Sequence, residues 1–243
     1  MTTASPATSR LVILVRKKNR PTCVVLPGAG GGLQPYLRLA GYLGSRYNVY
    51  GVRTLGMVAG EEPETTVPEM ADSVLATLDE QGLTPDLVVG WSMGGTLGWE
   101  LSTRLAERGH RPDLVLIDTS PLLRESTPEA DGDIEDNIVR QLGPHADEAT
   151  RTRVLETFRA QVRALTEYET TTPYAGRVLL TMCTGDRMGP REEATERWRE
   201  LAADLRTASL SATHFGVFDA EHFTELTEPI GKFLDLADPE AAR

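Results

Sequence analysis

The sequence predicts an α/β fold in which a mostly parallel central sheet carries helices on both faces. Short apolar runs rich in valine, leucine and isoleucine alternate with longer stretches of helical periodicity. Such alternation is typical of parallel strands joined by helical crossovers. The 243 residues, of which 40% are hydrophobic and 25% charged, suit one ordered domain of this class. We therefore expect a single domain over residues 1–243.

The apolar runs define the expected strands, and the periodic stretches define the helices between them. Strands are expected at residues 11–15, 22–27, 47–53, 86–90, 113–118 and 177–183, with a weaker one at 207–212. Helices are expected at 33–45, 67–82, 94–108 and 219–236, with Gly82 and Gly109 as the C-terminal stops of the second and third. Loops that follow parallel strands share one edge of the sheet, so the functional residues should converge there.

The alternation stops after residue 118. The next strand is expected at residue 177, and the segment between predicts helices at 133–142 and 147–168. We interpret residues 119–175 as a helical lid inserted at the functional edge, because long excursions of this kind are more often functional than decorative. Its acid-rich start, residues 125–136, is expected to be a solvated linker.

Composition and charge exclude several classes of function. The formal net charge of −11 disfavours nucleic acid and anionic membrane surfaces as partners. No segment resembles a signal-peptide core or a membrane span, so we expect a cytoplasmic protein. Cys23 and Cys183 lie in strand-like runs, where reduced and buried thiols are expected. The acid-rich segment lacks the tight ligand spacing of a calcium loop, so we expect no metal site.

The stretch "DLVVGWSMGGTLGWELS" (86–102) places a Gly-x-Ser-x-Gly pattern between an expected strand and an expected helix. In the α/β-hydrolase fold, a nucleophilic serine occupies a strained turn of this kind, which needs small neighbours. Gly90 and Gly94 provide them around Ser92. The amino end of the following helix would favour an oxyanion beside the serine. We therefore expect an α/β-hydrolase fold with Ser92 as nucleophile.

A serine nucleophile needs a histidine to accept its proton and a carboxylate to orient that histidine. In this fold the order along the chain is serine, acid, histidine. His214 follows the last expected strand and is favoured as the base, with His222, near the start of the terminal helix, as the alternative. Asp118 and Asp186 each follow an expected strand, and the residues alone leave the choice of acid open.

Two backbone N–H groups should stabilise the oxyanion. One is expected from Met93, the residue after the serine. The other is expected from Gly28 or Ala29 in the glycine-rich loop "LPGAGGG" (26–32), which follows the second expected strand. This loop lacks the lysine of a phosphate-binding P-loop, so we do not expect it to hold a nucleotide.

These motifs resemble the type I thioesterase domains that terminate nonribosomal peptide and polyketide synthases. The resemblance covers nearly the whole chain and rests on "GWSMGG", "ERGHRPDLVLIDTSPL", "TGDRMGP" with Trp198, "ATHF", "FGVF" and "GKFLD". In that family the acid follows the strand after the elbow helix, so the resemblance assigns Asp118. Standalone editing thioesterases usually place the acid where Asp186 stands and more often carry histidine in place of Trp91. Asp186 therefore stays the alternative acid.

The resemblance implies a serine thioesterase without a cofactor of its own. Its substrate would be an acyl, peptidyl or polyketide chain carried on the phosphopantetheine of an acyl or peptidyl carrier protein. Release would proceed through an acyl-enzyme, by hydrolysis or macrocyclisation. The alternatives are an acyltransferase that uses a separate hydroxyl or amine acceptor, a standalone type II editing thioesterase, a general carboxylesterase, and an inactive hydrolase-fold binding protein.

Overall fold

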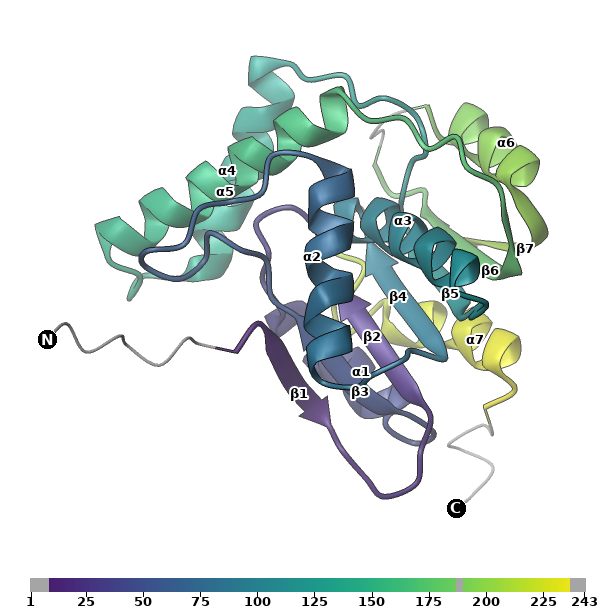
Figure 1. Cartoon of the computed structure of the whole chain (residues 1–243). Coiled ribbons are helices and arrows are strands. Elements are labelled where there is room, and N and C mark those ends of the chain that lie inside the picture. Colours follow the sequence, from purple (N-terminus) through teal and green to yellow (C-terminus); the bar gives the residue numbers. More distant parts are fainter. Residues whose placement is uncertain (1–8, 187–189, 237–243) are drawn as a thin grey trace, which may run out of the picture.

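A seven-stranded sheet runs through the middle of the molecule, in the order β1-β3-β2-β4-β5-β6-β7 (Figure 1). The computed structural model describes residues 9–186 and 190–236. Strand β1 pairs with β3 in antiparallel orientation, and the other neighbouring pairs are parallel. The strands are β1 Leu11–Val15, β2 Thr22–Leu26, β3 Asn48–Val52, β4 Leu87–Trp91, β5 Asp113–Ile117, β6 Tyr174–Cys183 and β7 Ala202–Leu210. The expected α/β architecture is confirmed.

Helices cover both faces of this sheet (Figure 1). A short 3-10 turn, Gln34–Tyr36, leads into α1, and the helices are α1 Leu37–Leu43, α2 Val67–Glu80, α3 Met93–Glu107, α4 Pro128–Leu142, α5 Glu148–Thr166, α6 Arg191–Leu201 and α7 Phe223–Leu234. Helices α2 and α3 pack on one face, and α1 and α7 pack on the other.

Each face has its own apolar core, because successive strand residues point to opposite sides. Val24 and Val88 join the core beneath α2 and α3, whereas Val25 and Val89 join the core beneath α1 and α7. These four side chains are fully buried. Strands buried on both faces explain why the central strands read as unbroken apolar runs in the sequence.

The expected insertion lies between β5 and β6 and carries the paired helices α4 and α5, which lie beside the carboxyl ends of the strands (Figure 1). The prediction of a linker over residues 125–136 is wrong from Pro128 onward, because helix α4 begins there. Thr127 caps α4 by accepting the Ala130 N–H at 3.2 Å, and proline suits the first helical position. The acids in the first turn favour the helix because they face the positive end of its dipole.

Helix α6 was not expected from the sequence. Its buried residues are Ala194, Trp198 and Leu201, spaced at helical intervals, while the rest of "REEATERWREL" is strongly polar. The buried stripe is narrow, so the hydrophobic signal of this helix is weak. The strand after it, β7, begins at Ala202, five residues earlier than expected from the weak run at 207–212.

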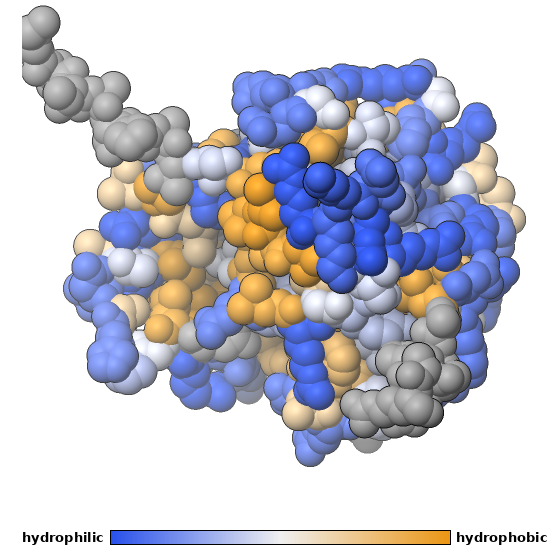
Figure 2. Space-filling model, turned by 90° about the horizontal axis from the view of Figure 1, so that it is seen from below, coloured by the Kyte–Doolittle hydropathy of each residue, from blue (hydrophilic) through white to orange (hydrophobic). Residues whose placement is uncertain are grey.

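Hydrophilic side chains cover much of the surface, with apolar patches between them, as Figure 2 shows for the face seen from below. Among the described residues, no helix has the length and apolar character needed to cross a membrane.

Candidate active site

Ser92 sits at the junction of β4 and α3 in a backbone conformation that side-chain-bearing residues seldom adopt. Its φ is 54° and its ψ −126°. Hydrogen bonds on both sides hold this turn: the Ser92 N–H donates to the Ile117 carbonyl at 2.9 Å, and the Ser92 carbonyl accepts the Gly95 N–H at 2.9 Å and the Thr119 hydroxyl at 3.1 Å. Such backbone strain costs about 1–3 kcal/mol and persists only where the surrounding structure holds it. Ser92 is partly exposed in this turn.

The tight turn depends on glycines. A Cβ atom on Gly90 would lie 2.1 Å from the Gly94 carbonyl oxygen, and one on Gly94 would lie 2.1 Å from the Leu26 carbonyl oxygen. A Cβ on Gly95 would meet the Thr119 Oγ1 at 2.0 Å. Strand β4, strand β2 and helix α3 approach so closely here that backbone occupies the space of a side chain.

A histidine and an aspartate from distant parts of the chain meet beside this turn. The Nδ1 atom of His214 lies 2.6 Å from Oδ2 of Asp118, and both residues are less than a tenth exposed. The other carboxylate oxygen of Asp118 accepts the Cys183 N–H at 2.9 Å. The Asp118 N–H donates to the Thr181 carbonyl at 2.7 Å, which anchors a residue whose φ is 46°. The carboxylate is thereby aimed at the imidazole.

The second aspartate contacts the same histidine in a different place. Oδ2 of Asp186 accepts the backbone N–H of His214 at 2.6 Å, and Oδ1 pairs with the guanidinium of Arg191. Asp186 therefore supports the loop that carries the histidine, while Asp118 contacts its ring.

His222 lies away from this pair, at the amino-terminal boundary of α7. Its ring nitrogens lie 3.6 Å from carboxylate oxygens of Glu221 and Glu225. Hydrogen bonds from Ser211, followed by that from His222, lower the pKa of Glu225. His222 thus belongs to a surface cluster that joins α7 to the end of β7.

Aromatic rings surround the buried imidazole. The Trp91 ring centroid lies 4.9 Å from that of His214 at an interplanar angle of 32°, and the Phe215 ring lies edge-on to both. The ring centroid of Phe218 lies 5.6 Å from that of Trp91, also in an edge-on arrangement. Stacked and edge-on rings restrict each other's rotation, so the indole holds one face of the imidazole.

The glycine-rich loop after β2 has most of its N–H groups already engaged. The Gly30 N–H donates to Gln161 at 2.8 Å, and the Gly31 N–H donates to the Gly28 carbonyl at 3.0 Å. The buried oxygen of Tyr36 interacts with the Gly28 N–H, which partly offsets the effect of burial in raising the pKa of that tyrosine. Among the described residues, no hydrogen-bond acceptor contacts the Ala29 N–H.

Met93 is the first residue of α3, directly after Ser92. The first N–H groups of an α-helix have no partner within the helix, and they carry its partial positive charge. Met93 and Ala29 are thus the two expected oxyanion donors whose N–H groups remain available.

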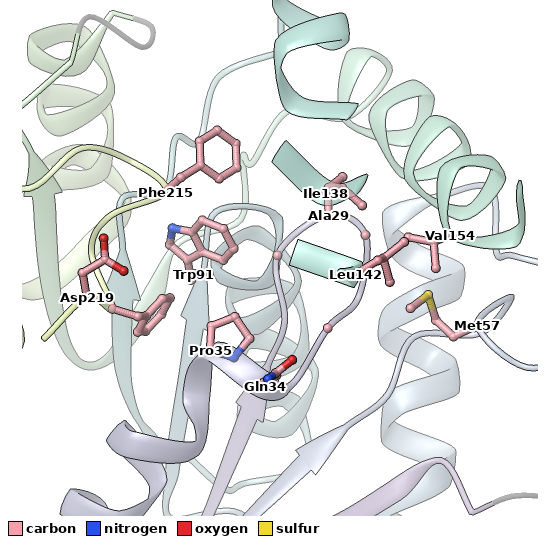
Figure 3. Close-up of a pocket in the computed structure, with 14 residues that line it drawn as sticks. Ala29, Gln34, Pro35, Met57, Trp91, Ile138, Leu142, Val154, Phe215 and Asp219 are labelled. Carbon is pink, nitrogen blue, oxygen red and sulfur yellow. The ribbon is translucent and has the colours of Figure 1, made fainter. Parts of the chain in front are cut away.

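A cavity of about 470 Å³ lies between the glycine-rich loop and the insertion. Figure 3 shows Trp91 and Phe215 on one side of it, and Ile138, Leu142 and Val154 of α4 and α5 on the other, with Ala29 in the loop between them. The lining is mainly apolar, and Asp219 is the charged residue that contributes to it. The site therefore consists of a serine elbow, an imidazole–carboxylate pair and an adjoining apolar cavity.

Comparison with known proteins bears directly on this arrangement. The model of the thioesterase domain family matches residues 21–234, which include every residue of the site. The chain belongs to the thioesterase domain family.

Relatives of the thioesterase domain include both large synthases and a protein of similar length. This chain is 33% identical over 101 residues to indigoidine synthase of Streptomyces lavendulae, but it spans only 8% of the length of that synthase. It is 33% identical over 131 residues to polyketide synthase GfsE of Streptomyces halstedii, of which it spans 3%. Thioesterase TesA of Mycobacterium marinum is 26% identical over 217 residues, which are 82% of this chain and 86% of TesA.

Solved structures share the fold of this thioesterase domain. BorB, a type II thioesterase from the borrelidin biosynthetic cluster, aligns with a TM-score of 0.76 at 22% identity and covers 95% of this chain and 100% of BorB. The NocB thioesterase domain from the nocardicin cluster aligns with a TM-score of 0.75 at 23% identity over 94% of this chain and 100% of that structure. The expected family and fold are therefore confirmed.

Three neighbours of the thioesterase site were not singled out from the sequence. Thr119 supports the elbow, Tyr36 supports the glycine-rich loop, and Gln161 of α5 bonds that same loop. Of these three, Gln161 is marked in the sequence, because it is a polar residue at the helical spacing of the apolar residues of α5; the structure shows that it is only 3% exposed. In the described part of the chain, no cluster of histidine, cysteine and acidic side chains is arranged to hold a metal ion.

Proposed function

We propose that this chain uses Ser92 to release an acyl chain from the phosphopantetheine thioester of a carrier protein. The observation that carries the proposal is the hydrogen bond between His214 and Asp118 beside the serine elbow. The family match supports thioester chemistry at that elbow.

The mechanism begins with attack of the Ser92 oxygen on the thioester carbonyl carbon. Nε2 of His214 accepts the serine proton, while Asp118 holds Nδ1–H and balances the charge of the imidazolium. The carbon–sulfur bond then breaks, and His214 returns the proton to the departing thiolate. An acyl-enzyme ester on Ser92 remains, and the phosphopantetheine thiol leaves with the carrier.

We propose Asp118 as the triad acid and Asp186 as a residue that positions His214. A triad carboxylate must bond the imidazole Nδ1 to fix its tautomer. The Asp118 carboxylate lies within 2.6 Å of that atom, while the Asp186 carboxylate bonds the backbone N–H and Arg191. These contacts favour Asp118.

For the oxyanion we propose the N–H groups of Met93 and Ala29. The developing negative charge is stabilised by donors that are already oriented and not engaged elsewhere. The Gly28 N–H interacts with Tyr36, so Ala29 is the better donor of the two residues considered in the loop. No cofactor held by this chain enters the proposed mechanism.

We propose that the cavity binds a neutral, largely apolar acyl chain. Burying apolar surface stabilises the complex by about 25 cal/mol per Å², and the lining offers aromatic and aliphatic side chains. A substrate carboxylate would lie near Asp219 in a strongly acidic protein, so anionic chains should be poor substrates.

Water, an internal nucleophile of the chain, or a separate acceptor would complete the reaction. Helices α4 and α5 form one wall of the cavity, which supports residues 119–175 as a lid that limits the access of water. Hydrolysis yields a free acid, whereas cyclisation and transfer retain the acyl group in a product of different mass. The alignment with TesA over 82% of this chain and 86% of TesA, and the fold shared with the type II thioesterase BorB, support a type II editing thioesterase as the second candidate.

The test is incubation of the protein with carrier proteins loaded with a panel of acyl chains, followed by mass spectrometry of protein and products. We expect an acyl adduct on Ser92 and released product, with both lost in Ser92→Ala and His214→Ala. His222→Ala is the matched control and should retain both. Turnover of simple oxygen esters in preference to carrier thioesters would contradict the proposal, as would full activity in folded His214→Ala.

A further inference from the structure

Helix α5 of the insertion contacts the candidate oxyanion loop through one polar side chain. Oε1 of Gln161 accepts the Gly30 N–H at 2.8 Å, in a buried bond between residues 131 positions apart. Gln161 is 3% exposed and lies on the side of α5 that also buries Phe158 and Val162. A buried polar group without a partner is costly, so loss of this acceptor would disturb the loop.

The bond acts on a loop that is confined on several sides. A Cβ on Gly28 would meet the Trp91 ring at 2.6 Å, and one on Gly30 would meet Ile138 of α4 at 3.0 Å. Gly30 and Gly31 both have positive φ, at 87° and 70°. Such a glycine loop has many alternative conformations, which the surrounding contacts must exclude.

The two loop hydrogen bonds orient consecutive peptide planes. The Gly28 carbonyl and the Ala29 N–H belong to one planar peptide group, and the Gly31 N–H fixes that group through the Gly28 carbonyl. The next peptide group contains the Gly30 N–H, which Gln161 holds. Between them, these bonds set the direction in which the unengaged Ala29 N–H points.

We infer that Gln161 is a positioning residue that orients the Ala29 N–H for oxyanion stabilisation and so makes catalysis depend on the placement of α5. The inference rests on the proposed function. The insertion therefore does more than cover the cavity, because it supplies a hydrogen bond that organises the oxyanion loop.

The first test replaces Gln161 with methionine, which keeps a similar volume but cannot accept this hydrogen bond. Removing one oxyanion donor costs about 10²–10³-fold in kcat in other hydrolases, so a misoriented donor should cost about 10-fold or more. KM should change by less than about 2-fold, because the cavity lining is intact. The measurement is steady-state hydrolysis of a short acyl thioester of pantetheine.

Thr157→Val is the matched control. Thr157 lies one turn earlier on α5, is fully buried, and its hydroxyl has no partner among the described residues. Its replacement perturbs the same helix without touching the loop bond, so kcat and KM should stay within about 2-fold of wild type. Gln161→Glu, which retains an acceptor oxygen, should recover part of the activity lost in Gln161→Met.

Phosphonylation of Ser92 by a fluorophosphonate separates this inference from the proposed function. The phosphoryl oxygen uses the same donors, so labelling of Gln161→Met should slow by the same factor as kcat, even if natural thioesters proved not to be substrates. If Gln161→Met does not fold, Gln161→Asn, whose carbonyl is one methylene shorter, should show an intermediate loss. Wild-type labelling and turnover in either folded variant would overturn the inference.

Discussion

Two aspartates contact His214, and each bonds a different part of it. Asp118 bonds the imidazole itself, and its own carboxylate is fixed by the Cys183 N–H. Asp186 bonds the His214 backbone and Arg191. From the sequence both are strand-ending aspartates with equal claims, because spacing along the chain does not reveal which carboxylate reaches the ring.

The substitutions Asp118→Asn and Asp186→Asn should therefore lower kcat/KM to very different extents. Loss of Asp118, the proposed triad carboxylate, disturbs the histidine tautomer and should lower kcat/KM by about 10³-fold or more. Asp186→Asn keeps an oxygen that can accept the His214 N–H, and loses mainly an ion pair, so kcat/KM should fall by less than about 10-fold. Kinetics on one thioester substrate measure both, and the reverse order of effects would make Asp186 the triad acid.

At the scale of elements, the strand, the turn and the helix around Ser92 form one unit. Helix α3 begins at the residue after the serine, and the glycines before and after it let α3 approach β2 and β4 closely. The pattern "GWSMGG" predicted this element correctly, since only glycine fits where backbone atoms lie about 2 Å from a Cβ position. Helix α4 is a contrasting element, with a glycine that no close contact requires.

A glycine-to-alanine substitution should change the free energy of unfolding in opposite directions in these two helices. Gly94→Ala forces a methyl group onto the Leu26 carbonyl and should lower the free energy of unfolding by at least about 2 kcal/mol. In helix α4, a Cβ added at Gly132 would have no neighbouring atom within 4 Å. Gly132→Ala should therefore raise the free energy of unfolding by about 0.5–1 kcal/mol. Urea denaturation followed by circular dichroism measures both. Equal effects of the two changes would show that the elbow is not tightly packed.

At the scale of the whole molecule, five strand ends meet at one edge of the sheet. The glycine-rich loop follows β2, and Ser92 follows β4. Asp118, Asp186 and His214 lie in the segments that follow β5, β6 and β7, respectively. The parallel sheet explains this convergence, which the alternating pattern predicts. Beneath that edge, the core under α1 and α7 encloses both cysteines.

Both thiols should stay unreactive while the molecule is folded. Cys23 and Cys183 are fully buried, and burial raises the pKa of each thiol; Asp118 raises that of Cys183 further. Thiolate is the reactive form, so iodoacetamide should modify neither residue in native protein at neutral pH. In urea both should react, and mass spectrometry counts the adducts. Rapid native alkylation of either cysteine would contradict the packing of this core.

The sequence by itself determined the fold class, the family and the small set of residues from which a site could be built. Apolar runs and glycine spacing reflect local backbone geometry, and local geometry can be predicted from neighbouring residues in the sequence. Only the tertiary structure decided which aspartate meets the imidazole, that Gln161 reaches the Gly30 N–H, and that Trp91 lies against His214. Those contacts join residues far apart in sequence, and their distances depend on how the loops and helices pack, which no local pattern specifies.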